Sequence, residues 1–150
     1  MKRVKDYMVR EIPILNENTS IREILNIFSS SEHNILPVVD EEGKLIGVVG
    51  LEDILENLIL SKKEAILLEK LHFLVDVFSE FFEELECISP LILAEDIMKR
   101  DVVTVKQEDS IIKAMILMKK RNVHRLIVVD DRKKPIGYIG RNEICKALIR

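Results

Sequence analysis

The sequence predicts an α/β (α+β) fold built from two copies of one βαββα unit. A shift of ninety residues aligns 4–59 with 94–149 without a gap, and 16 of the 56 pairs are identical. Each copy alternates short β-prone runs with amphipathic helical stretches. With 150 residues, 47% of them apolar, the chain is long enough for one well-buried core. We therefore expect copies at 4–60 and 94–150, joined by a helical insert at 61–93.

Each copy begins with a short β-prone run, at residues 12–15 and 102–105, and continues through polar residues into a helix. Ser20 and Ser110 suit the position that caps such a helix, and Ser20 with Glu23 has capping-box spacing. Apolar residues then recur at the i, i+3, i+4, i+7 spacing of a core-facing helix. They are Ile21, Ile24, Leu25 and Phe28 in the first copy and Ile111, Ala114, Met115 and Met118 in the second.

A buried β-hairpin follows in each copy. The paired strands are residues 35–39 and 45–49 in the first copy, and 126–129 and 135–139 in the second. Polar turns join them, as is typical of hairpins. Gly50 and Gly140 come next, and apolar residues after each glycine indicate a closing helix. These residues are Ile54, Leu58 and Ile59, and Ile144, Leu148 and Ile149.

Residues 61–86 contain neither Gly nor Pro, and Pro90 follows them, so a long helix is predicted between the copies. Its main apolar stripe consists of Leu67, Leu71, Leu74, Phe78, Phe81 and Leu85, and a second strip of Ile66, Phe73 and Val77. A helix that contacts only its own module has little use for a second strip. We expect a homodimer that uses this helix, with packing back onto its own sheets as the alternative.

Charge is unevenly distributed along the chain. Residues 1–61 and 62–93 carry −5 and −4, whereas residues 94–150 carry +6. A basic final third suits an anion-binding surface, and solvated lysines on outer helix faces are the alternative. No nucleic-acid recognition motif accompanies it, so nucleic acid is an unlikely partner.

The sequence also narrows the compartment and the chemistry. No apolar run is long enough for a membrane span, and no signal peptide is evident, so we expect a cytoplasmic protein. Cys87 and Cys145 fit neither a metal motif nor a secreted disulfide framework. The three histidines form no ligand-spaced cluster, and no G-x-S-x-G, Walker or G-x-G-x-x-G string occurs. We expect no catalytic residue, no catalytic cofactor and no metal site.

The order of elements resembles that of the cystathionine-β-synthase (CBS) family. Residues 6–8 and 96–98 resemble the motif that starts the CBS repeat, residues 36–40 its central strand, and residues 46–54 its last strand and helix. Two tandem repeats form the family's Bateman module, which implies two halves related by a pseudo-twofold axis with two clefts between them. Those clefts take AMP, ADP, ATP or S-adenosylmethionine. The resemblance implies a regulatory sensor whose occupancy changes its docking onto a regulated protein or a second copy.

Particular residues correspond to the family's ligand contacts. The base slot corresponds to Ile12, Pro13, Asn34, Ile35, Val102, Val103, Val123 and His124. Plain core packing is the alternative for these positions. The acid that accepts from the ribose hydroxyls corresponds to Asp53 and Glu143. Each stands at a helix start, where an acid that only caps the helix would look the same.

The phosphate contacts differ between the copies. His124 and Arg125 resemble the histidine-arginine pair that meets phosphates in the γ subunit of AMP-activated protein kinase, and the planar arginine fork suits phosphate oxygens. A solvated pair at a strand edge is the alternative. The first copy has His33 and Asn34 instead, offset by one residue and without an arginine. The two clefts are therefore predicted to be inequivalent.

Gly50 and Gly140 depart from the family pattern. The family commonly has Ser or Thr there, whose hydroxyl supports a phosphate. Losing one charge-assisted hydrogen bond weakens binding by about 1.5–3 kcal/mol. The alternative function is therefore a non-catalytic dimeric interaction scaffold with vestigial clefts.

Overall fold

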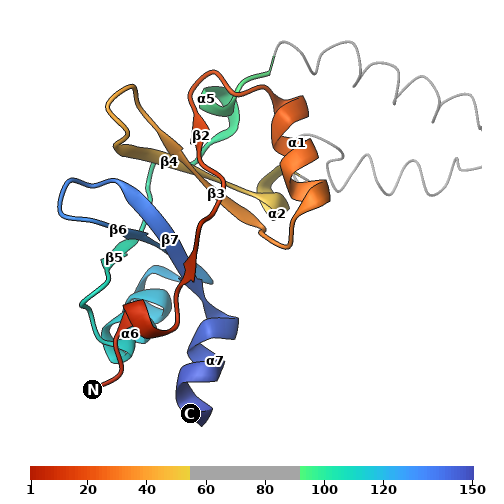
Figure 1. Cartoon of the computed structure of the whole chain (residues 1–150). Coiled ribbons are helices and arrows are strands. Elements are labelled where there is room, and N and C mark those ends of the chain that lie inside the picture. Colours follow the sequence, from red (N-terminus) through yellow and green to blue (C-terminus); the bar gives the residue numbers. More distant parts are fainter. Residues whose placement is uncertain (55–91) are drawn as a thin grey trace, which may run out of the picture.

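The computed structural model describes residues 1–54 and 92–150, which form two β-sheets with helices packed on them (Figure 1). One sheet has the order β2-β3-β4 and the other β1-β7-β6-β5. The strands are β1 (Val9–Arg10), β2 (Leu15–Asn16), β3 (Ile35–Val39), β4 (Leu45–Gly50), β5 (Thr104–Lys106), β6 (Arg125–Val129) and β7 (Pro135–Gly140). The helices are η1 (Val4–Asp6), α1 (Ile21–Ser30), α2 (Leu51–Ile54), α5 (Ala94–Ile97), α6 (Ile111–Arg121) and α7 (Arg141–Ile149). The predicted α+β class is confirmed, and the helix predicted for 61–86 lies outside the described residues.

The two long helices that precede the hairpins begin as their sequences predict. Ser20 Oγ accepts a hydrogen bond from the backbone N–H of Glu23 at 3.2 Å, and Ser110 Oγ accepts one from Lys113 at 3.0 Å. At the end of α6, Asn122 adopts a left-handed conformation with φ of 53°. Its N–H donates to the carbonyl of Met118, which is a common way to end a helix.

The strands of the hairpins bury both of their faces. Leu36 and Val38 belong to the core under α1, and Leu126 and Val128 belong to the core under α6. Their neighbours in the strands face the space between the two sheets instead, because successive side chains point to opposite sides. This middle cluster consists of Ile12, Ile35, Val48, Ile127, Val129 and Tyr138. The two sheets are thus joined by an apolar layer.

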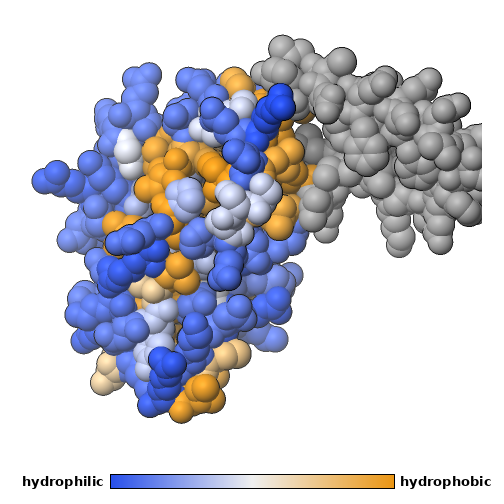
Figure 2. Space-filling view, turned by 45° about the vertical axis from the view of Figure 1, so that its right-hand side comes forward, coloured by the Kyte–Doolittle hydropathy of each residue, from blue (hydrophilic) through white to orange (hydrophobic). Residues whose placement is uncertain are grey.

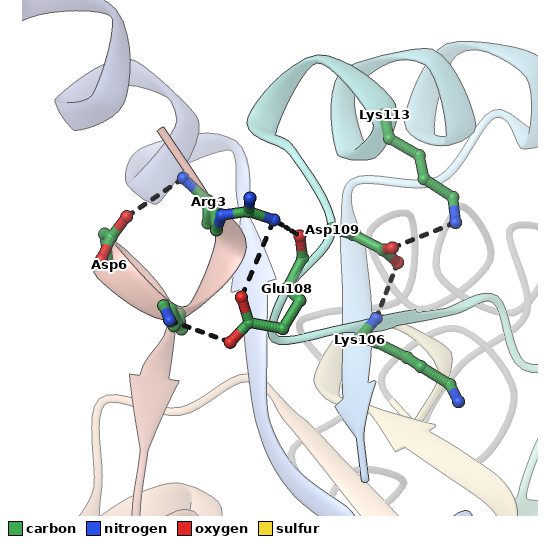
Figure 3. A network of polar contacts seen from close by, with 7 residues as sticks. Arg3, Asp6, Lys106, Glu108, Asp109 and Lys113 are labelled. Carbon is green, nitrogen blue, oxygen red and sulfur yellow. Dashed lines mark hydrogen bonds and ion pairs between the residues drawn. The ribbon is translucent and has the colours of Figure 1, made fainter. Parts of the chain in front are cut away.

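The leading segment of the first copy packs on the second copy. Strand β1 pairs antiparallel with β7, and Val4 and Met8 lie in the core of the second copy. Polar contacts reinforce this arrangement (Figure 3). Lys5 Nζ lies 2.8 Å from Glu108 Oε1, and Arg3 also pairs with Glu108.

The leading segment of the second copy packs on the first copy in return. Ala94 donates a backbone hydrogen bond to Thr19 at 2.8 Å. Val48 and Lys99 exchange two backbone hydrogen bonds, of 2.9 and 3.0 Å. Each half of the molecule therefore contains residues of both repeats, although the repeats are contiguous in sequence.

This exchange explains why the predicted leading strands have the wrong bounds. In place of one strand at 12–15, the chain forms β1 and β2, which belong to different sheets. Glu11 lies between them with a positive φ of 57°, where the chain turns from one sheet to the other. The β-prone residues at 12–14 cross between the sheets rather than pair. In the second copy the strand begins at Thr104 rather than at residue 102.

The predicted core faces of the helices are correct for their central residues and wrong at the edge. Ile21, Ile24 and Phe28 of α1 are buried, whereas Leu25 is 38% exposed. In α6, Met115 is likewise 37% exposed. Both residues lie at the edge of the apolar stripe.

Candidate functional site

A cavity between the repeats lies beside Asp53 and has a volume of about 360 Å³. We call it the Asp53 cleft. Eight of the predicted site residues line it, namely Ile35, Gly50, Asp53, Val102, Val103, Val123, His124 and Arg125. Residues that the sequence reasoning did not single out complete its wall, including Val48, Glu52, Lys99, Asp101, Asn122 and Ile127. Both repeats therefore contribute to one cleft.

Asp53 is held at the rim of this cleft. It lies in the first turn of α2, directly after β4, and its side chain is 23% exposed. Its Oδ1 atom lies 3.0 Å from Nζ of Lys99, whose backbone is bonded to Val48 of β4. The ion pair orients the carboxylate and leaves it accessible to a molecule in the cleft.

The interior of the cleft is apolar. Val48 and Ile35 come from the first repeat, and Val102, Val103 and Ile127 from the second. Val48, Ile35 and Ile127 also belong to the cluster that joins the sheets, so this wall is part of the core. A cavity of this size, with an apolar wall and a few polar groups at its edge, is typical of small-molecule sites.

Arg125, the predicted phosphate contact, already has a carboxylate partner. Its Nη2 atom lies 2.7 Å from Oε1 of Glu52, and the hydrogen bond to Arg125 lowers the pKa of the Glu52 carboxyl below its usual value. Glu52 and Arg125 are 73 positions apart, so the sequence could not reveal the pair. Glu52 occupies part of the guanidinium, so a phosphate at Arg125 would share the remaining donors or replace Glu52.

The second cavity lies beside Glu143 and has a volume of about 260 Å³. We call it the Glu143 cleft. Its walls are Glu32, Asn34, His124, Arg125, Tyr138, Gly140, Arg141, Asn142 and Glu143. Asn34, Gly140 and Glu143 are predicted site residues, and His124 and Arg125 line both cavities.

Glu143 is tied to the start of its own helix. The residue is only 8% exposed, and its Oε1 atom accepts a hydrogen bond from the backbone N–H of Gly140 at 2.9 Å. This is the capping arrangement that the sequence left open as an alternative to ribose binding. Glu143 is thus bonded to the backbone of Gly140, whereas Asp53 is paired with the exposed side chain of Lys99.

Two of the predicted slot residues line neither cavity. Ile12 is buried, at 7% exposure, in the same cluster as Tyr138. Pro13 follows it and is partly buried. Tyr138 was not predicted as a site residue. The aligned repeats contain a signal for it, because Tyr138 occupies the position of Val48, which lines the Asp53 cleft.

The two glycines fit closely beside these acids. A Cβ atom at position 50 would lie 2.9 Å from Oδ2 of Asp53. A Cβ atom at position 140 would lie 3.1 Å from Cγ of Arg125 and 3.3 Å from Oε1 of Glu143. A Ser or Thr at either position would therefore have to displace a neighbouring side chain. The observed positions of the two carboxylates therefore depend on glycine at residues 50 and 140.

Other kinds of site are not evident in the described parts of the chain. Within residues 1–54 and 92–150, no group of three His, Cys, Asp or Glu side chains is arranged to hold a metal ion. Across the same residues, no helix has the length and apolar character needed to cross a membrane.

Comparison with known proteins relates this architecture to one family. The family model of the CBS domain matches residues 4–60 and 94–150. An uncharacterised protein of Methanocaldococcus jannaschii is 30% identical over 146 residues, which cover 97% of this chain and 39% of that protein. The chain thus spans well under half of that relative's length.

Solved structures of CBS-domain pairs have the same fold. CBSX2 of Arabidopsis thaliana, in complex with AMP, superimposes with a TM-score of 0.71 at 22% identity, covering 99% of this chain and 97% of that one. The CBS domain pair of protein MJ0100, in complex with 5′-methylthioadenosine and S-adenosyl-L-methionine, gives a TM-score of 0.70 at 24% identity, covering 99% and 96%.

Proposed function

Since the chain belongs to the CBS-domain family and carries two copies of the domain, we propose that it is a regulatory module that senses an adenine-containing ligand in the Asp53 cleft. The candidate ligands are AMP, ADP, ATP and S-adenosylmethionine. The observation that carries this proposal is the cleft itself, in which an apolar wall and an accessible carboxylate meet. The AMP-bound and S-adenosylmethionine-bound relatives support the choice of ligand class.

The cleft offers a separate contact to each part of such a ligand. An adenine ring has apolar faces, and Val48, Val102 and Ile127 provide an apolar wall for it. Ribose hydroxyls are donors, and the Asp53 carboxylate accepts charge-assisted hydrogen bonds, which are stronger than neutral ones. Lys99 pairs with Asp53 and holds its carboxylate in position at the rim.

Phosphate groups, where the ligand has them, extend toward His124 and Arg125. Both residues line the cleft, and the arginine fork suits phosphate oxygens. The phosphate takes the place of Glu52, whose Oε1 atom lies 2.7 Å from Nη2 of Arg125. A ligand without phosphate leaves this ion pair intact. Nucleotides and S-adenosylmethionine therefore lead to different surfaces beside α2.

Occupancy is coupled to the arrangement of the two repeats. The cleft has Ile35, Val48 and Asp53 on one side and Val102, Ile127 and Arg125 on the other. A ligand that touches both repeats stabilises the arrangement in which it binds. A regulated protein, or a second copy of the chain, that recognises this arrangement then responds to the ligand.

Thermal unfolding tests the proposal with four compounds: AMP, ADP, ATP and S-adenosylmethionine. A ligand at a hundred times its dissociation constant stabilises by about 2.7 kcal/mol, which raises the midpoint by several degrees. Asp53→Asn should lose the shift, whereas Asp131→Asn is the matched control, because Asp131 is exposed, pairs with Lys106 and does not line the cleft. No shift with any compound at millimolar concentration contradicts the proposal.

A dimeric scaffold is the second candidate, and exposed apolar side chains favour it. In α6, Ile112 is 66% and Ile116 is 49% exposed, and in α7, Leu148 is 63% and Ile149 is 83% exposed. Figure 2 shows apolar surface at the lower end of the molecule, at the level where Figure 1 places the C-terminus. We expect a homodimer that covers these helices. Light scattering should then report twice the chain mass of 17.4 kDa, and Ile116→Glu should lower it.

A further inference from the structure

The two clefts are related by the internal repeat, so each residue of one has a counterpart in the other. Val48 lines the Asp53 cleft, and its counterpart ninety positions later is Tyr138. Val102 and Val103 also line the Asp53 cleft, and their counterparts are Ile12 and Pro13. The wall of the Glu143 cleft contains Tyr138 but neither Ile12 nor Pro13. The wall of the Glu143 cleft therefore lacks the apolar residues that correspond to Val102 and Val103.

The position of Tyr138 explains this difference between the two clefts. The residue is 8% exposed and packs in the middle cluster with Ile12 and Val129. Its hydroxyl lies 3.2 Å from Nδ1 of His33, and the two rings meet edge to face with centroids 5.8 Å apart. The tyrosine ring therefore belongs to the same buried cluster as Ile12, the counterpart of Val102. His33 fixes the ring from the other repeat.

The polar part of the second cleft remains usable. Oε1 of Glu143 accepts a hydrogen bond from the N–H of Gly140, whereas Oε2 has no hydrogen bond among the described residues. Asn34, Arg125 and Arg141 line the same cleft. What the second cleft lacks is space for a flat apolar group, and the tyrosine ring is the flat group already there.

We propose that Tyr138 closes the Glu143 cleft to adenine ligands, so that each chain has one ligand site, beside Asp53. The identity of the ligand rests on the proposed function, whereas the closure rests on the geometry of Tyr138. Tyr138 is thus the residue that sets the number of ligands per chain. Its counterpart Val48 is the residue that keeps the first cleft open.

Isothermal titration calorimetry with AMP, and in parallel with S-adenosylmethionine, tests the stoichiometry. The wild-type chain should bind one molecule per chain. Tyr138→Val, which installs the side chain of the open cleft, should add a second and weaker binding event, so that the total becomes two. Tyr138→Phe is the matched control, because it keeps the ring and removes the hydroxyl, and it should still bind one molecule.

Two outcomes overturn the proposal. One is a wild-type chain that binds two molecules, and the other is a folded Tyr138→Val variant that still binds one. A melting curve of each variant establishes that it is folded. If Tyr138→Val does not fold, Tyr138→Leu, which also lacks a ring and fills more of the space, replaces it with the same expectation of two.

A second measurement separates closure from the proposed function. The chain has two tyrosines and no tryptophan, so Tyr7→Phe leaves Tyr138 as the only source of tyrosine fluorescence. In this variant, acrylamide should quench the emission several-fold less than it quenches the same protein in urea, with or without ligand. Strong quenching of the folded protein overturns the closure. If no titration gives heat while the tyrosine is protected, the proposed function fails and the closure stands.

Discussion

The Asp53 cleft and the Glu143 cleft occupy equivalent places in the two repeats but have different contents. In the first, a carboxylate at the rim stands over an apolar wall that is open. In the second, the carboxylate caps its helix, and a tyrosine ring lies on the wall. The repeated fold therefore sets the positions of two clefts. Side chains at a few related positions decide which cleft can take a ligand.

The largest effect is expected from closing the open cleft. Val48→Tyr places in the Asp53 cleft the side chain that fills its counterpart, so adenine ligands should bind at least about 100-fold more weakly, a loss of about 2.7 kcal/mol. Val48→Leu is the control, since it enlarges the side chain without adding a ring. Calorimetric titration of both folded variants measures the effect. Wild-type affinity in Val48→Tyr would show that the ligand does not use this wall.

A smaller effect should distinguish the two acids. Asp53→Ala removes a charge-assisted contact worth about 1.5–3 kcal/mol, so ligand affinity should fall about 10- to 100-fold. Apo stability should change little, because Lys99 is 63% exposed and such ion pairs contribute little. Glu143→Ala should do the reverse, with a loss of about 1 kcal/mol of stability and unchanged affinity. Denaturant unfolding and calorimetry on both variants make the comparison, and the opposite pattern contradicts it.

The next effect concerns Arg125 and depends on the ligand. Arg125→Ala removes the cation and leaves Glu52 unpaired, so affinity should fall more for ATP and ADP than for adenosine, by about 10-fold for one lost charge-assisted contact. The difference should shrink at high salt, where charges are screened. Arg125→Lys should recover part of it, because it restores the charge without the planar fork. Equal losses for adenosine and ATP would show that Arg125 only shapes the cleft.

The smallest effect is a pH dependence of stability. The pKa of Glu52 is lowered from 4.5 in the folded chain, mainly by its hydrogen bond to Arg125. A lowered folded pKa stabilises the protein above the unfolded value, and this contribution is lost as the pH falls through the folded pKa. Because Glu52 is 56% exposed, the contribution should be below about 1 kcal/mol. Urea unfolding of wild type and Glu52→Gln should therefore differ at pH 7 and converge as the pH falls below 4.5 and through the lowered pKa of Glu52. A constant difference would contradict the ion pair.

The hairpins and helix starts could be predicted from the sequence because their signals are local. The predicted strand 35–39 has the bounds that are observed, and Ser20 and Ser110 cap their helices as expected. The leading strands could not be predicted equally well, because residues 9–16 divide between two sheets. That division depends on partners more than a hundred positions away, such as Tyr138 for Val9.

The candidate site divides in the same way. Asp53, Val102 and Arg125, which the family resemblance placed among the ligand contacts, line one cavity, and their contact with a ligand stays a prediction. The pairing of Arg125 with Glu52, and the bond between Glu143 and Gly140, depend on which rotamers the folded chain permits. The substitution of Val48 by Tyr138 was visible in the aligned repeats. Its consequence required knowing that both residues face the space between the sheets.

The most direct test of the central claim is a crystal structure of the wild-type chain with the compound that stabilises it most. We predict one ligand per chain in the Asp53 cleft, with its base against Val48 and Val102 and its ribose hydroxyls on the Asp53 carboxylate. The Tyr138 ring should remain in the buried cluster that contains Ile12. Density for a ligand in the Glu143 cleft, alone or together with the first, would contradict the account.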